Sequence, residues 1–411
     1  MKFAFVQCRI TPWWALSVFK DLIEEQKDIV NRQKNKWSEA FLDDWLIPTT
    51  WEHASTKEMK WLQSSKADRW MGHGKVFTLF SDCTKITTQH HKLEVVTALP
   101  KRVNKLFLRC STHKIPILSR LFDYRNLIFF YPSLMKILSK KIKHFHPNHI
   151  FISSFAIAKN ITPISGVETT LYLHSPMQYI RTHYDEYKEK LKWIKGKLFN
   201  RIVPKLRKRD LKFTKFDKIY ANSKYTAKVA EELYGMNTIE IKYPCIPNKF
   251  FIPAIQETPQ AYYIYVGRVV SFVREADKII QLCNEMKVPL IMMGSGPDEA
   301  YLKSIAGPSI IFIGWITDVD DKIKIISQAK WLINLTKESY GIWTVEALLL
   351  GVPVFGYGEW ATAELVDENC GILVKNKQHH TLVEWFKKFM NTQWNRTMIA
   401  KSIREKRKNR I

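Results

Sequence analysis

Two glutamates separated by seven residues are the most suggestive feature of the chain. Glu338 follows an apolar run that ends near Leu335, and Glu346 lies about one turn inside a helix expected to begin near Trp343. A carboxylate has two acceptor oxygens, which suits the hydroxyl groups of a sugar or a ribose. Gly341, between the two acids, would let a ligand approach the backbone closely. The spacing therefore predicts a site for a polyhydroxylated ligand.

The start of the same helix predicts an anion site. Free backbone N–H groups around Tyr340, Gly341, Ile342 and Trp343 would point at a phosphate resting on the helix N-terminus. Ligands of doubly wound folds bind at the carboxyl ends of strands, where this loop belongs. Acidic residues also stabilise helix N-termini without any ligand, so the surrounding sequence has to decide between the two interpretations.

Apolar runs of strand length, separated by segments of helical periodicity, must position these residues. The clearest runs occupy residues 2–6, 75–80, 93–99, 149–154, 168–174, 218–223, 262–267, 289–294, 309–315, 330–335, 353–358 and 371–374. Strands that alternate with helices predict an α/β fold with parallel sheets. Continuously apolar strands are typical of sheets covered on both faces.

The organisation into domains follows from a proline-containing segment at residues 247–260. It separates an N-terminal Rossmann-like domain at 1–250 from a second one at 258–380. Residues 381–411 form a C-terminal helix and basic tail, which could pack back on the first domain or lie on an anionic surface. Residues 31–74, rich in tryptophan, interrupt the strand–helix alternation and are expected to be an insertion.

The charge balance limits the partners. The 411 residues carry 64 Lys and Arg against 39 Asp and Glu, a net charge of +25 that attracts nucleic acid, anionic membranes or phosphorylated substrates. The excess is concentrated at 136–143, 188–218 and 401–410. Solvated faces of a lysine-rich protein would give the same balance. A nucleic-acid-binding protein is therefore an alternative, but charge is its only support because no nucleic-acid-binding motif is present.

The cysteines and the apolar runs point to a location. Six cysteines lie far apart and form no CxxC pair, so neither a zinc site nor a disulfide framework is indicated. No run approaches the roughly 20 apolar residues of a membrane-spanning helix. We therefore expect a cytoplasmic protein, soluble or peripheral on the inner membrane face.

The segment ESYGIWTVEALLLGVPV, residues 338–354, resembles the signature of retaining glycosyltransferase family 4. Further matching segments follow the family order at 173–187, 209–235, 243–246, 265–268 and 292–315, so the resemblance covers about 150–375. Within that family, the segments most resemble the mannosyltransferase-like branch of bacterial surface-polysaccharide synthesis. The resemblance implies the GT-B fold, in which two Rossmann-like domains face each other across a cleft.

The resemblance also implies roles for individual residues. Glu338 would contact hydroxyls of the donor sugar, and Glu346 the ribose of its nucleotide. Arg268 would hold the diphosphate, for which the bidentate guanidinium is suited. His174 would face the reacting sugar and a donor phosphate. The remaining donor-binding positions are Gly267, Arg274, Gly294, Trp315 and the loop from Ser339 to Ile342.

Three departures from the family pattern leave alternatives open. Val273 stands where the family has a lysine, although Arg274 is adjacent. The glycine-rich loop after the first strand is missing, and residues 359–361 lack the usual glycine-rich turn. The donor or acceptor would then be unusual, or the chain would be a catalytically weak GT-B pseudoenzyme serving as a partner subunit.

The expected reaction is transfer of a hexose, mannose being favoured, from a GDP- or UDP-linked donor. The acceptor would be a hydroxyl of a lipid-linked saccharide at an anionic membrane surface, and no nucleic-acid partner is expected. The resemblance implies attack from the front face with retention of configuration. We expect no metal and no cofactor beyond the nucleotide sugar, since Asp318 and Asp320, which have the Asp-x-Asp spacing of a metal site, are typical of a helix N-cap.

Overall fold

The structure is a computed structural model that describes residues 3–9, 74–80, 85–87, 92–97, 130–155, 157–190, 193–253, 255 and 258–408. The chain divides into two compact units. The first comprises residues 1–222 and 226–244, and the second comprises residues 223–225 and 245–411. The tryptophan-rich segment expected at 31–74 lies outside the described residues, apart from Gly74 at its end.

The first unit is built on an eight-stranded sheet, counted over its described residues, with the order β3-β4-β2-β1-β5-β6-β7-β8. All neighbouring strands are parallel except β3 and β4, which pair antiparallel. The strands are β1 (Phe3–Arg9), β2 (Gly74–Phe80), β3 (Lys85–Thr87), β4 (Lys92–Thr97), β5 (His149–Ser154), β6 (Glu168–Leu173), β7 (Lys218–Ala221) and β8 (Ile239–Ile241).

Helices connect these strands, as parallel pairing requires. They are α4 (Tyr131–Phe145), η3 (Ala158–Asn160), η4 (Gln178–Ile180), α5 (Tyr184–Lys190), α6 (Trp193–Asp210) and α7 (Lys224–Tyr234). Strand β5 is buried along its whole length, which explains its continuously apolar start. Helix α4 buries one stripe, including Met135, Leu138 and Ile142, and exposes lysines on the opposite side.

The second unit contains a six-stranded, entirely parallel sheet with the order β11-β10-β9-β12-β13-β14. Its strands are β9 (Tyr263–Val266), β10 (Leu290–Met293), β11 (Ile310–Gly314), β12 (Trp331–Asn334), β13 (Val354–Tyr357) and β14 (Gly371–Val374). Its helices are η5 (Asn248–Phe251), α8 (Ala276–Glu285), α9 (Glu299–Ile305), α10 (Val319–Gln328), α11 (Ile342–Leu349), α12 (Thr362–Leu365), α13 (His379–Asn391) and α14 (Arg396–Lys408).

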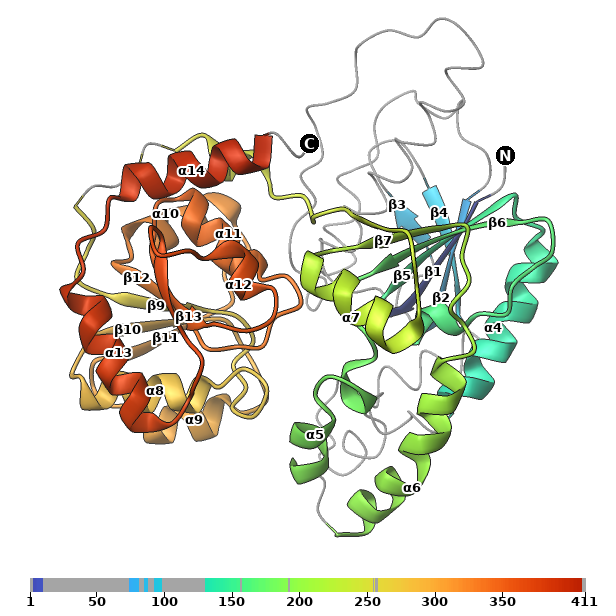
Figure 1. Cartoon of the computed structure of the whole chain (residues 1–411), viewed down its shortest axis with the longest axis horizontal. Coiled ribbons are helices and arrows are strands. Elements are labelled where there is room, and N and C mark those ends of the chain that lie inside the picture. Colours follow the sequence, from blue (N-terminus) through green and yellow to red (C-terminus); the bar gives the residue numbers. More distant parts are fainter. Residues whose placement is uncertain are drawn as a thin grey trace, which may run out of the picture. The chain divides into compact units, whose positions relative to one another are not determined.

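Helices cover both faces of this second sheet. Helices α8, α9 and α13 lie on one side, and α10, α11 and α14 lie on the other (Figure 1). Strands β9, β12 and β13 are consequently buried throughout. The prediction of an α/β fold with two parallel-sheet units is confirmed.

The start of α10 in the second unit follows directly from a sequence signal. The carboxylate of Asp318 accepts hydrogen bonds from the backbone N–H groups of Asp320 and Asp321, at 2.8 and 3.0 Å, which confirms it as the N-cap of α10. The C-terminal helix α14 is anchored to this unit by Arg396, whose guanidinium donates to the carbonyls of Ser327 and Ala329. Among the described helices, none is both long enough and apolar enough to cross a membrane.

Candidate functional site

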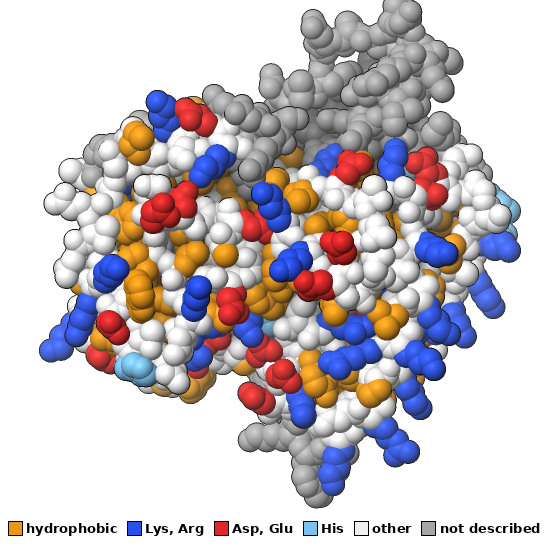
Figure 2. Space-filling view, in the orientation of Figure 1, with side chains coloured by type: hydrophobic (Ala, Val, Ile, Leu, Met, Phe, Trp, Pro, Cys, Tyr) orange, Lys and Arg blue, Asp and Glu red, His pale blue; other side chains and the backbone are white. Residues whose placement is uncertain are grey.

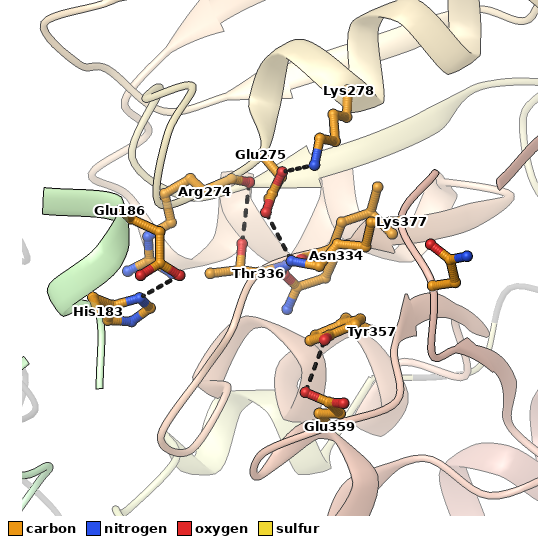
Figure 3. Close-up of polar contacts among 12 residues, drawn as sticks. His183, Glu186, Arg274, Glu275, Lys278, Asn334, Thr336, Tyr357, Glu359 and Lys377 are labelled. Carbon is orange, nitrogen blue, oxygen red and sulfur yellow. Dashed lines mark hydrogen bonds and ion pairs between the residues drawn. The ribbon is translucent and has the colours of Figure 1, made fainter. Parts of the chain in front are cut away.

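The carboxyl ends of β9, β10, β12 and β13 meet at one edge of the second sheet, because all four strands are parallel. Most of the predicted donor-binding residues follow these strand ends. Gly267 comes after β9, Gly294 after β10 and Glu338 after β12. Figure 3 shows polar contacts that connect the loop after β9 to the loops after β12 and β14.

Arg274 and Glu338 form an ion pair within this group of loops. The Nη1 of Arg274 donates to the Oε1 of Glu338, and the side chain of Glu338 is 12% exposed. The hydroxyl of Thr336 donates to the carbonyl of Arg274 at 3.3 Å, which ties the two loops together (Figure 3). Arg274, which follows the departure at Val273, therefore provides a cation beside the first glutamate of the motif.

Arg268 is a second cation at the end of β9. Its side chain is exposed, and among the described residues it forms no ion pair. The hydroxyl of Tyr265 donates to its carbonyl at 2.6 Å and fixes the backbone there. An exposed guanidinium beside a strand-end glycine is available to a phosphate.

Glycines let the loops after β9 and β10 touch. Gly294 has a φ of 142°, and a Cβ built on it would lie 1.8 Å from the carbonyl oxygen of Gly267. The amide of Gly267, in turn, donates to the carbonyl of Met293 at 3.0 Å. Any larger residue at 294 would separate the two strand ends, so this glycine is required by close backbone approach.

Glu346 lies inside α11 and is buried, with a relative exposure of 2%. Lys322 of α10 contacts both of its carboxylate oxygens, at 2.7 and 2.8 Å. Burial raises the pKa of Glu346, and the nearby ammonium of Lys322 opposes that shift. The second glutamate of the motif is thus a carboxylate neutralised from within the protein.

Aromatic rings surround the Lys322 ammonium. It lies 4.3 Å from the ring centroid of Trp343 and 5.2 Å from that of Phe250. Trp315, one of the predicted donor-binding positions, contacts Trp343 edge-on with centroids 5.7 Å apart. Trp315 and Glu346 are therefore linked through Trp343 in one cluster.

The loop between the two glutamates enters α11 through Gly341. Gly341 is the N-cap residue and has a φ of 90°, in the left-handed region that favours glycine. Tyr340 is buried, whereas Ser339 and Ile342 are half-buried. The predicted anion-binding amides thus lie at the N-terminus of a helix of the described structure.

His174 follows strand β6 of the first unit and is 2% exposed. Its Nε2 is hydrogen-bonded to the hydroxyl of Ser153 at 2.8 Å. Burial lowers the pKa of His174 to about 3, so the ring is neutral at physiological pH. A neutral imidazole can donate or accept a hydrogen bond but cannot act as a standing positive charge toward a phosphate.

Sequence reasoning missed three contributors to the site. Lys322 contacts Glu346, which lies 24 positions later in the chain. Lys377 contacts Glu275, which directly follows Arg274 and lies 102 positions earlier. Lys322 is one of two lysines in α10, and only its place on the buried side of that helix separates it from Lys324. Among the described residues, no group of three His, Cys, Asp or Glu side chains could hold a metal ion.

With this geometry established, comparison with known proteins is informative. Residues 247–406 match the family of glycosyl transferases group 1. The second unit is a glycosyl transferases group 1 domain. This domain contains both glutamates, Arg268 and Arg274. No curated protein matches the chain.

The family match covers only the second unit, whereas several solved structures are similar to this chain over both units. Sucrose-phosphate synthase from Thermosynechococcus elongatus has a TM-score of 0.59 at 15% identity, covering 81% of this chain and 83% of that one. WaaG, a glycosyltransferase involved in lipopolysaccharide biosynthesis, has a TM-score of 0.55 at 14% identity, covering 98% and 93%. HepE of Anabaena, solved in complex with UDP, has a TM-score of 0.51 at 14% identity, covering 82% and 92%. These likenesses show the GT-B fold.

Proposed function

We propose that this protein is a retaining glycosyltransferase that moves a hexose from a nucleoside-diphosphate sugar to a saccharide hydroxyl. The observation that carries the proposal is the grouping, in a glycosyl transferases group 1 domain, of Glu338 with Arg274 beside the exposed Arg268. Two guanidiniums suit a diphosphate, and the carboxylate that pairs with Arg274 suits sugar hydroxyls. HepE was solved with UDP, which supports a nucleotide ligand for this fold.

Each group has a part in the transfer. Arg268, Arg274 and the amides at the start of α11 would stabilise the charge that develops on the departing diphosphate. Glu338 would orient the donor sugar, and Glu346 would accept from the ribose hydroxyls. These groups neutralise the leaving group by themselves, so we propose catalysis without a metal ion. We favour mannose and a GDP- or UDP-linked donor on the family resemblance.

The proposal is tested with a panel of nucleotide sugars. The wild-type protein should bind one donor and release its nucleoside diphosphate, and the product should keep the anomeric configuration by NMR. Glu338→Gln should lower the turnover at least about 100-fold, as loss of a group that acts on the transition state does. Glu285→Gln, the same change on the exposed surface of α8, is the matched control. A protein that binds no donor, or whose Glu338→Gln variant keeps full turnover, is not this enzyme.

We also propose that the acceptor is lipid-linked and that the protein works at an anionic membrane surface. Lys136, Lys140 and Lys143 are exposed along α4, and α6 exposes further Lys and Arg side chains. Figure 2 shows many blue Lys and Arg side chains over the part of the first unit that contains these helices. Each such charge near an anionic surface contributes about 1 kcal/mol.

Vesicle flotation tests the membrane proposal. The protein should bind vesicles that contain phosphatidylglycerol and should dissociate from them at high salt. It should not bind vesicles of phosphatidylcholine alone. Replacement of the three α4 lysines by glutamine should weaken binding roughly 100-fold, which corresponds to about 3 kcal/mol. Binding that is indifferent to salt and to anionic lipid would exclude the proposal, and a salt-sensitive RNA complex would favour the nucleic-acid alternative.

A further inference from the structure

Lys377 is a largely buried lysine that connects three segments of the second unit. It lies between β14 and α13, and its side chain is 10% exposed. Its Nζ is 2.7 Å from the Oε1 of Glu275 and donates to the carbonyl of Leu335 at 3.2 Å. The same ammonium lies 4.0 Å from the ring centroid of Tyr357, at the end of β13 (Figure 3). One charge therefore contacts residues that follow β9 and β12 and the last residue of β13.

Glu275, the partner of Lys377, holds an unusual backbone conformation. It is the N-cap residue of α8 with φ 54° and ψ 28°, in the left-handed region that non-glycine residues rarely adopt. Such a conformation persists only where the surroundings enforce it. Its carboxylate is held by Lys377 on one oxygen and by Lys278 on the other, at 2.7 and 2.8 Å (Figure 3). Two ion pairs thus fix the residue that directly follows Arg274.

The second contact of Lys377 is with the loop that follows β12 and contains Glu338. Leu335 is three positions before Glu338, and its side chain is fully buried, so this part of the loop is anchored on both sides. Thr336 adds the hydrogen bond to the carbonyl of Arg274. Lys377 accordingly supports Arg274 through Glu275 and supports Glu338 through Leu335, although it contacts neither.

We propose that Lys377 is a positioning residue that sets the geometry of Arg274 and Glu338 for the sugar diphosphate of the donor. The identity of the substrate in this inference rests on the proposed function, whereas the contacts of Lys377 do not. Burial lowers the pKa of Lys377 and Glu275 opposes the shift, as expected for an ammonium held in place by a partner. Displacement of reacting groups by about 1 Å can cost 100-fold in rate.

The experiment compares Lys377→Met with Lys278→Met. Both variants remove an ammonium from Glu275, but Lys278 is 39% exposed and, within the described residues, contacts neither Leu335 nor Tyr357. Lys377→Met should lower kcat/KM for the nucleotide sugar about 10- to 100-fold. It should leave the affinity for the free nucleoside within about twofold, because the cluster around Glu346 is separate from this contact. Lys377→Arg should restore part of the loss, and Lys278→Met should keep kcat/KM within about threefold.

Amide hydrogen exchange of the ligand-free protein gives a readout that does not depend on the donor. Lys377→Met should accelerate exchange at 268–276 and at 335–341 together, whereas Lys278→Met should leave 335–341 unchanged. Equal losses of nucleoside and nucleotide-sugar binding, or exchange that rises throughout the second unit, would show a merely structural ion pair and overturn the inference. If the wild type bound no nucleotide sugar, the proposed function would fail, while the exchange result would still decide whether Lys377 holds the two loops.

Discussion

The ammonium of Lys322 contacts both carboxylate oxygens of Glu346, at 2.7 and 2.8 Å, within a buried part of the second unit. The two residues come from consecutive helices, α10 and α11, that lie on the same side of the sheet (Figure 1). A carboxylate with 2% exposure would be costly without a counter-charge. The pair therefore supplies the counter-charge that this buried carboxylate needs.

Removal of Lys322 should lower both the unfolding free energy and the affinity for the nucleotide. Lys322→Met leaves a buried carboxylate unpaired, which typically costs about 3 kcal/mol of unfolding free energy. We also expect the affinity for the nucleotide to fall at least about tenfold, since Glu346 would take up a proton and lose acceptor capacity. Urea denaturation and calorimetry measure the two effects. Lys324→Met, an exposed lysine of the same helix, should change the unfolding free energy by less than about 0.5 kcal/mol.

His174 should make the protein sensitive to acid. Its pKa is lowered by burial from 6.5 to about 3, so the unfolded chain binds a proton that the folded chain does not. The stabilisation is complete above pH 6.5 and is lost as the pH falls toward 3, at about 1.4 kcal/mol per pH unit. His174→Gln should flatten this dependence when unfolding of the first unit is followed at pH 7 and pH 5. Burial also lowers the pKa of His149, so His149→Gln is compared in parallel. An unchanged slope in His174→Gln would show that the ring is solvated.

Arg274 and Glu338 should act as a unit in turnover. Arg274→Met removes the ion pair and one expected diphosphate contact, so kcat/KM should fall at least about 100-fold. The double variant with Glu338→Gln should lose much less than the product of the two single effects, because each single change already breaks the pair. Steady-state kinetics of the four proteins measures the coupling. Independent, multiplicative losses would mean that the two side chains serve separate parts of the donor.

Gly294 should tolerate no side chain. Its Cβ would lie 1.8 Å from the Gly267 oxygen, so Gly294→Ala has to move a strand end and should cost more than about 3 kcal/mol. Gly314→Ala is the control, since its φ of 73° is also left-handed but nothing lies within 4 Å of its Cβ. That change should cost about 1 kcal/mol, the strain of the backbone alone. Similar thermal shifts for both variants would contradict the close approach.

Much of the fold was predictable because it depends on local patterns. Continuous apolar runs in β9, β12 and β13 reflect burial on both faces, and they predicted parallel sheets correctly. The capping role of Asp318 was predictable for the same reason, since its partners are two and three residues away. The spacing of Glu338 and Glu346 likewise placed one acid in a loop and one in a helix.

The tertiary structure alone decided how these residues are paired. Glu346 was expected to contact a ribose, and only the fold shows that its buried carboxylate pairs with Lys322, 24 residues earlier. Glu275 and Lys377 are 102 residues apart and meet because β9 and β14, which precede them, end at the same edge of one parallel sheet. Burial and the pairing of distant charges depend on strand order, which one strand's residue pattern does not encode. The sequence by itself therefore determined the secondary-structure elements and the acidic residues of the site. The order of the strands in the sheet determined which charged residues pair with those acids.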